Sequence, residues 1–79
     1  MRLLLAEDEK EMAAAVTAVL QYSGYEVDCV FDGLSAVDMA QKNVYDCMIF
    51  DIMMPKMSGV EALKILRRSG DVTPVIMLT

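Results

Sequence analysis

Polar and apolar positions divide the chain into strands and helices that alternate. Short apolar runs bounded by turn residues predict strands at 2–6, 45–50 and 75–78. Residues 25–30 alternate between polar and apolar instead, which predicts an edge strand with one exposed face. Between the strands, apolar residues recur at helical spacing over about 9–22, 34–42 and 60–66. The order β-α-β-α-β-α-β, with short connections, predicts right-handed βαβ units around one parallel sheet.

The ends of the predicted helices carry local signals. Gly24 and Gly70 follow the first and third helices, where glycine readily takes the left-handed conformation that caps a helix. Ser58 and Glu61 have the spacing of a capping box, in which the serine caps the helix and the glutamate reaches back to it. Phe31-Asp32-Gly33 is a turn sequence ahead of the second helix.

Length and composition indicate one small domain without a membrane span. With 79 residues and 56% hydrophobic content, the chain can form a single, marginal core. No apolar stretch approaches the roughly 20 residues of a membrane helix, and the early acids exclude a signal peptide. We therefore expect a cytoplasmic location and no membrane partner. The net charge of -5 excludes a nucleic-acid footprint on this segment.

The two cysteines are interpreted as small buried hydrophobic residues. If one strand separates the strands of Cys29 and Cys47, their backbones lie about 9–10 Å apart. A disulfide requires Cα atoms within roughly 7 Å. The sequence has no histidine, so a zinc site is not expected and a Ser-His-Asp or Cys-His mechanism is excluded.

The functional hypothesis starts from acids that follow two apolar runs. Glu7 and Asp8 come directly after the first predicted strand, and Asp51 comes directly after the third. In a sheet of order 2-1-3-4 these strands are neighbours at the switch point, where open α/β sheets bind ligands. Thr79 follows the fourth strand and reaches the same edge. Converging carboxylates without a Lys or Arg among them predict a hard divalent cation. Mg²⁺ fits because it leaves room for a phosphoryl oxygen.

Each of these residues also has a simpler interpretation. A single acid at a strand end is more often solvated or caps a helix than binds a ligand, and Thr79 alone is only a strand-end hydroxyl. Their occurrence together on one edge favours the site. Met53, Met54 and Met57 are interpreted as gap-filling residues or loop anchors rather than a cofactor motif.

Three segments together resemble the receiver domain of two-component response regulators, most closely the subfamily with a winged-helix DNA-binding output domain. They are residues 3–9 (Leu-Leu-Leu-Ala-Glu-Asp-Glu), residues 45–59 around Asp51, and residues 74–79 (Pro-Val-Ile-Met-Leu-Thr). The resemblance implies a flavodoxin-like, CheY-like α/β fold. Its doubly wound parallel sheet would have the order 2-1-3-4, and residues 1–79 would form a partial receiver domain.

The resemblance also implies a role for each site residue. Asp51 would be the phosphoacceptor that takes a phosphoryl group from a sensor histidine kinase, and would also bind Mg²⁺. Asp8 would bind the metal directly, Glu7 would assist through water, and Met53 would supply its backbone carbonyl. Thr79 would be the switch hydroxyl that bonds the phosphoryl group. Such a domain assists its own phosphorylation and dephosphorylation and is not classed as an enzyme.

The chain departs from the family pattern because it stops after the fourth strand. The family's site lysine at the end of a fifth strand has no counterpart, since Lys10 and Lys56 are placed differently. We therefore expect weakened phosphorylation and DNA binding only through an output domain that is absent. We also expect an apolar patch beside the first helix. The exposed edge of the last strand predicts homo-oligomers, strand exchange or partial disorder.

Two other functions stay open. The chain can be a fragment that folds or self-associates without phosphotransfer. A Mg²⁺-dependent enzyme with a Toprim-like site is the other alternative, but it requires a DxD sequence, and Asp51-Ile52-Met53 lacks the second acid.

Overall fold

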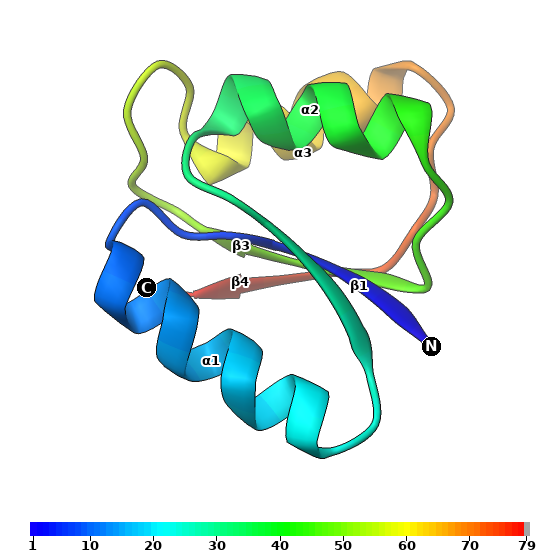
Figure 1. Cartoon of the computed structure of the whole chain (residues 1–79). Helices are drawn as coiled ribbons and strands as arrows, with labels where there is room; N and C mark the ends of the chain where they lie inside the picture. Colours follow the sequence, from blue (N-terminus) through cyan, green and yellow to red (C-terminus); the bar gives the residue numbers. More distant parts are fainter. Residues whose placement is uncertain (79) are drawn as a thin grey trace.

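The computed structural model describes residues 1–78 and contains a four-stranded parallel sheet with helices on both faces (Figure 1). In chain order the elements are β1 Arg2–Ala6, α1 Lys10–Tyr22, β2 Glu26–Val30, α2 Gly33–Lys42, β3 Cys47–Asp51, α3 Gly59–Arg68 and β4 Val75–Leu78. The strand order β2-β1-β3-β4 confirms the predicted order, and β2 is an edge strand as expected. The switch point therefore lies between β1 and β3.

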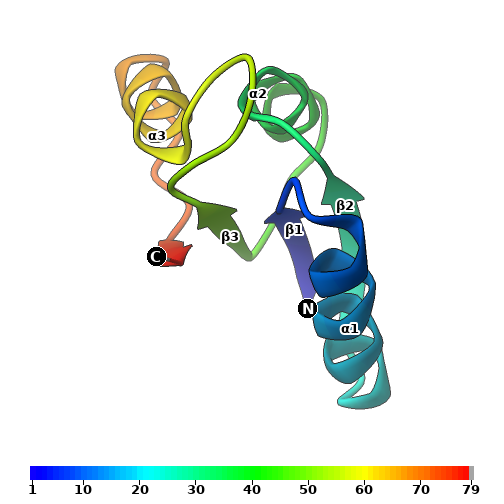
Figure 2. The same ribbon diagram turned by 90° about the vertical axis from the view of Figure 1, so that its left-hand side faces the viewer.

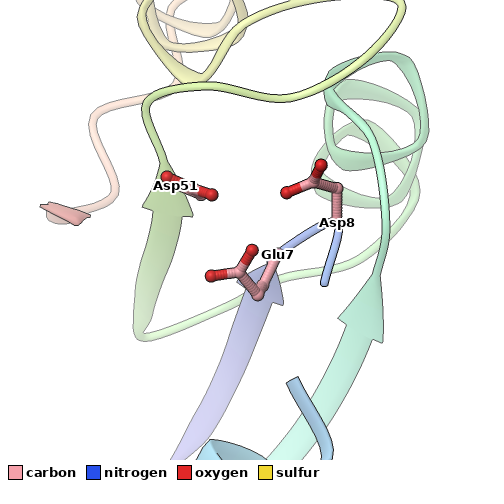
Figure 3. Close-up of side chains that lie close together, drawn as sticks. All are labelled: Glu7, Asp8 and Asp51. Atoms are coloured by element: carbon pink, nitrogen blue, oxygen red, sulfur yellow. The ribbon is translucent and has the colours of Figure 1, made fainter. Parts of the chain in front are cut away.

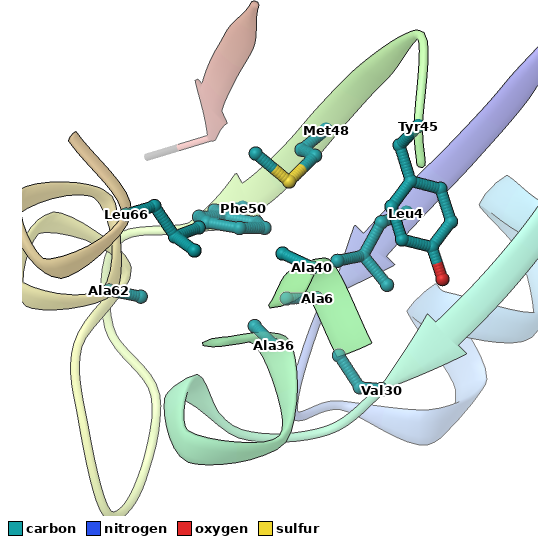
Figure 4. Packing of buried hydrophobic residues seen from close by; sticks show 10 residues of the cluster. All are labelled: Leu4, Ala6, Val30, Ala36, Ala40, Tyr45, Met48, Phe50, Ala62 and Leu66. Atoms are coloured by element: carbon teal, nitrogen blue, oxygen red, sulfur yellow. The ribbon is translucent and has the colours of Figure 1, made fainter. Parts of the chain in front are cut away.

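The main core lies between the sheet and the helix pair α2 and α3, which pack side by side (Figures 1 and 2). Alternate strand residues point to opposite faces, so Leu4 and Ala6 face this helix pair. The buried apolar residues of this core come from five elements and the segment before β3. They are Leu4, Ala6, Val30, Ala36, Ala40, Tyr45, Met48, Phe50, Ala62 and Leu66 (Figure 4).

The opposite face of the sheet is only partly covered. Helix α1 packs on β1 and β2, where it buries Ala13 (Figure 2). Ile76 on β4 stays 54% exposed and Val19 on α1 stays 66% exposed. Residues 12–20 carry no charged side chain, and a helix that is apolar on several sides normally has several sides covered. The predicted apolar patch beside the first helix is therefore present.

Glycines end two of the helices as predicted. Gly24, with φ of 95°, donates its N–H to the carbonyl of Gln21 at 3.0 Å, and Tyr25 donates to Leu20 at 3.1 Å. This pair of bonds is the Schellman motif, which satisfies the last helical carbonyls. Gly70 ends α3 in the same way, with φ of 92°.

The predicted bounds of four elements need correction. α1 begins at Lys10 rather than at residue 9, and β2 begins at Glu26 rather than at residue 25. α2 begins at Gly33, one residue early, because Asp32 caps it by accepting the N–H of Ser35 at 2.7 Å. β3 begins at Cys47 and extends through Asp51, rather than covering 45–50. The Asp46 carboxylate accepts the backbone N–H of Arg2 at 2.7 Å, which removes that donor from the ladder.

The capping box of α3 forms in part. The hydroxyl of Ser58 accepts the N–H of Glu61 at 3.1 Å, as predicted. The Glu61 carboxylate bonds the Ser58 hydroxyl at 3.3 Å, whereas a full box uses the backbone N–H of the capping residue. Helix α3 is therefore capped mainly by one side chain.

The two cysteines are less buried than predicted. Cys29 and Cys47 are free thiols, half-buried rather than fully buried, and β1 lies between their strands. Within residues 1–78, no helix is both long and apolar enough to cross a membrane.

Candidate functional site

The register of β1 and β3 brings the predicted acids together. Ala6 pairs with Phe50, so the residues that follow them, Glu7 and Asp51, lie at the same level at the carboxyl edge of the sheet. Asp8 follows one residue later in the turn that leads to α1. One carboxylate oxygen from each of these three acids lies within 4.8 Å of the others (Figure 3). The convergence expected from the strand order is confirmed.

Glu7 is the buried member of the cluster. Its side chain is only 8% exposed, and its carboxylate accepts the N–H of Glu9 at 3.2 Å. Its backbone N–H donates to the carbonyl of Val30 at 3.1 Å, and this bond ties the turn after β1 to the end of β2. Burial is the main cause that raises the pKa of Glu7, and the neighbouring Asp51 raises it further. A buried acid beside other acids is unfavourable unless something compensates its charge.

No basic side chain compensates these acids among the residues that the structure describes. Lys10 lies over the ring of Phe31, with its Nζ 5.4 Å from the ring centroid. Lys56 pairs with Asp32, its Nζ 3.7 Å from Oδ2. The ion pairs within residues 1–78 leave Glu7, Asp8 and Asp51 without a cationic partner. Clustered carboxylate oxygens of this kind fit a hard divalent cation such as Mg²⁺.

The acids form part of the wall of an open cavity of about 550 Å³. Its walls come from the ends of β1, β3 and β4, the start of α1 and the loop after β3; the residues are Glu7, Asp8, Glu9, Met12, Asp51, Met53 and Leu78. The predicted ligand Met53 is thus at the site, with a side chain that is 77% exposed. Thr79, the predicted switch hydroxyl, lies outside the described residues. Met12 and Leu78 were not predicted to line this cavity, because the helix and strand patterns do not show which side chains face a cavity.

The backbone around Asp51 is held from two sides. The N–H of Ile52 donates to the carbonyl of Leu78 at 3.0 Å, and the N–H of Gly59 donates to the carbonyl of Ile52 at 2.9 Å. A Cβ at Gly59 would lie 2.1 Å from the carbonyl oxygen of Asp51. The backbone at Asp51, the last residue of β3, is therefore held by β4 on one side and by the start of α3 on the other.

Known proteins are similar to this chain in sequence. Residues 3–79 match the response regulator receiver domain family. The chain is 47% identical over 79 residues to the transcriptional regulatory protein DltR of Streptococcus agalactiae, covering 100% of this chain and 35% of that protein. The chain thus spans about a third of that relative's length.

Two solved structures have the same fold. The receiver domain of the Francisella response regulator 1452 superposes with a TM-score of 0.94 at 36% identity, covering 96% of this chain and 63% of that one. The response regulator TrrA of Thermotoga maritima, solved in complex with Mg²⁺-BeF, gives a TM-score of 0.93 at 33% identity, covering 99% of this chain and 68% of that one.

Proposed function

This chain belongs to the response regulator receiver domain family, and from that premise we propose that Asp51 accepts a phosphoryl group from a sensor histidine kinase. The supporting observation is the convergence of Glu7, Asp8 and Asp51, whose ligand atoms lie within 4.8 Å of one another. A divalent cation would compensate the charge of this cluster, and next to Asp51 it would prepare the site for an incoming phosphoryl group.

The proposed reaction uses Asp51 as a nucleophile. One oxygen of its carboxylate forms a bond to phosphorus, while the bond between phosphorus and the donor breaks and its electron pair leaves with the donor. The product is an acyl phosphate on Asp51. Asp8 and Asp51 would hold Mg²⁺ directly, Glu7 through water, and Met53 through its backbone carbonyl. When bound, the ion supplies charge neutralisation for the carboxylates and the phosphoryl oxygens.

The domain acts as a phosphoacceptor that assists its own phosphorylation and dephosphorylation, rather than as an enzyme that turns over a substrate. In this proposal Thr79 supplies the hydroxyl that bonds the phosphoryl group. Lys10 and Lys56 take no part, because each is held by another partner.

The longer protein is proposed to be a cytoplasmic transcription regulator. DltR, described as a transcriptional regulatory protein, is about three times as long as this chain, since the chain covers 35% of it. DNA binding would belong to a separate output domain, because this segment carries a net charge of -5. The receiver domain would then pass the phosphorylation signal to that output.

Intact mass after incubation with acetyl phosphate and Mg²⁺ tests the proposal. We expect one added phosphoryl group, which is lost when Mg²⁺ is chelated and lost in Asp51→Asn. Asp46→Asn is the matched control, because Asp46 is an exposed acid that directly precedes β3, at the end opposite to Asp51. An adduct that persists in Asp51→Asn, or no adduct in a folded sample, would contradict the proposal.

A second candidate function is self-association without phosphotransfer. It is favoured by the position of β4 at the sheet edge, together with Ile76, which is 54% exposed. Unpaired strand edges recruit further strands, so two copies can join through β4. Sedimentation velocity across a concentration series tests this, and a monomer at all concentrations would exclude it.

A further inference from the structure

The loop that follows Asp51 packs against the first turn of α2, far from it in sequence. In Figure 2 this loop rises from the end of β3 and passes beside α2 before α3 begins. A Cβ at Gly33, the first residue of α2, would lie 2.1 Å from the carbonyl oxygen of Met57 and 2.7 Å from its carbonyl carbon. These are backbone atoms, so a larger residue at Gly33 must displace the loop itself.

A second contact joins the same two segments. Asp32 caps α2 by accepting the N–H of Ser35 at 2.7 Å and its hydroxyl at 3.1 Å. Oδ2 of this carboxylate, which accepts the hydroxyl, also faces Lys56, whose Nζ lies 3.7 Å away. Lys56 has φ of 67°, a left-handed conformation that is unfavourable for a residue with a side chain and persists only where its surroundings hold it.

Between its two ends the loop makes few backbone hydrogen bonds, and it is anchored there by the side chain of Met54, which packs against the main core. Its start is fixed by Ile52, which bonds both Leu78 and Gly59. Neither Met53 nor Met54 makes a backbone hydrogen bond to another residue within 1–78. The place of Met53 at the acidic cavity therefore depends on the packing of Met54 and on how the two ends of the loop are held.

We propose that Gly33 and Asp32 are positioning residues for the metal site, because they hold Met57 and Lys56 and thereby fix the loop that carries Met53. The inference rests on the proposed function, in which the Met53 carbonyl binds Mg²⁺. α2 thus takes part in metal binding without contributing a ligand. Replacing residues that hold metal ligands in place, without binding the metal themselves, typically lowers metal affinity by roughly 10–100-fold.

Gly33→Ala tests the steric contact. Gly33 has ordinary helical φ, so alanine there would otherwise favour the helix. We expect the Mg²⁺ dissociation constant, measured from amide chemical shifts of the ¹⁵N-labelled chain, to rise by about tenfold. Gly24→Ala is the matched control. It is strained by φ of 95° but meets nothing within 4 Å, so it lowers stability and leaves the dissociation constant unchanged.

Asp32→Asn tests the second contact. It also replaces Gly33→Ala as the deciding variant if Gly33→Ala does not fold. Asparagine keeps the cap of α2 but removes the charge that faces Lys56. We expect the dissociation constant to rise at most about fivefold, because Lys56 is largely exposed although Asp32 is mostly buried. Asp38→Asn is the control, since it breaks an exposed ion pair within α2, with Lys42 at 3.0 Å.

The outcomes separate the inference from the function on which it rests. If the unaltered chain shows no Mg²⁺-dependent shifts, both are overturned. If it binds Mg²⁺ and folded Gly33→Ala binds equally well, only the positioning role is wrong. If Gly33→Ala does not fold, Asp32→Asn decides: an unchanged dissociation constant overturns the inference, and an increase that Asp38→Asn does not share supports it.

Discussion

The Cα of Gly59 packs directly against the backbone carbonyl of Asp51. A Cβ at Gly59 would lie 2.1 Å from the oxygen and 3.0 Å from the carbon of that carbonyl. Gly59 is also the first residue of α3, so this helix begins in contact with the proposed phosphoacceptor. The site and the start of α3 therefore cannot move independently.

Gly59→Ala should weaken both the fold and the site. Alanine would favour the helix by roughly 0.5–1 kcal/mol, but overpacking against backbone costs about 1–3 kcal/mol, so we expect a net loss in the free energy of unfolding. The phosphoryl adduct on Asp51 should fall as well. Urea unfolding and intact mass measure the two effects. In Gly70→Ala, where φ of 92° causes strain but no atom lies within 4 Å, stability should fall while the adduct remains.

Mg²⁺ should stabilise the chain through the acidic cluster. A ligand that binds only the folded state at 100 times its dissociation constant adds about 2.7 kcal/mol to the free energy of unfolding. Thermal unfolding with Mg²⁺ and then with chelator measures the change, with NaCl at equal ionic strength as the salt control. Asp8→Asn removes one of the three carboxylates and should abolish most of the shift. An equal shift in this variant would mean that the ion binds elsewhere.

Tyr45→Phe should reduce stability in a pH-dependent way. The Tyr45 hydroxyl donates to Oδ2 of Asp28 at 2.7 Å, and Arg2 donates to the same oxygen at 2.8 Å. The hydrogen bond from Tyr45 is the main cause that lowers the pKa of Asp28, and Arg2 adds to it. Loss of a hydrogen bond to a charged group costs about 1.5–3 kcal/mol, and Asp28 is partly solvated, so we expect the lower end.

The sign follows from the direction of that pKa change. A carboxyl whose folded pKa lies below its unfolded value adds stability above the unfolded value, 3.8, and loses it as pH falls through the folded pKa. The difference in the free energy of unfolding between the unaltered chain and Tyr45→Phe should therefore be largest at neutral pH. It should shrink as the pH falls below 3.8. Urea unfolding at several pH values measures it. Tyr22→Phe, at a side chain that is 95% exposed, is the control and should change nothing.

Ile76→Lys should reduce self-association. Ile76 lies on β4, at the edge of the sheet and on the partly covered face, where a charge opposes both strand pairing and apolar contact. Sedimentation velocity should show a smaller average species at equal concentration. Val44→Lys, at a residue that is 87% exposed outside the strands, controls for the added charge. Equal association in both variants would locate the contact elsewhere.

The local sequence by itself determines many features of this protein's helices and strands. Gly24 and Gly70 end helices because only residues that tolerate positive φ can close a Schellman motif, and the apolar runs mark the strands. The parallel order then places Glu7 and Asp51 on one edge, because each directly follows a residue of a register pair. These predictions succeed because they depend on sequence spacing and on the geometry of a single element.

Only the tertiary structure decided which residues support the site from a distance. Gly33 and Met57, or Asp32 and Lys56, are separated by more than twenty positions, and no local pattern pairs them. The same holds for Asp46, whose carboxylate accepts the backbone N–H of Arg2 just before β3 begins. The physical reason is that local sequence sets each element's conformation, whereas contacts between elements depend on how the chain packs as a whole.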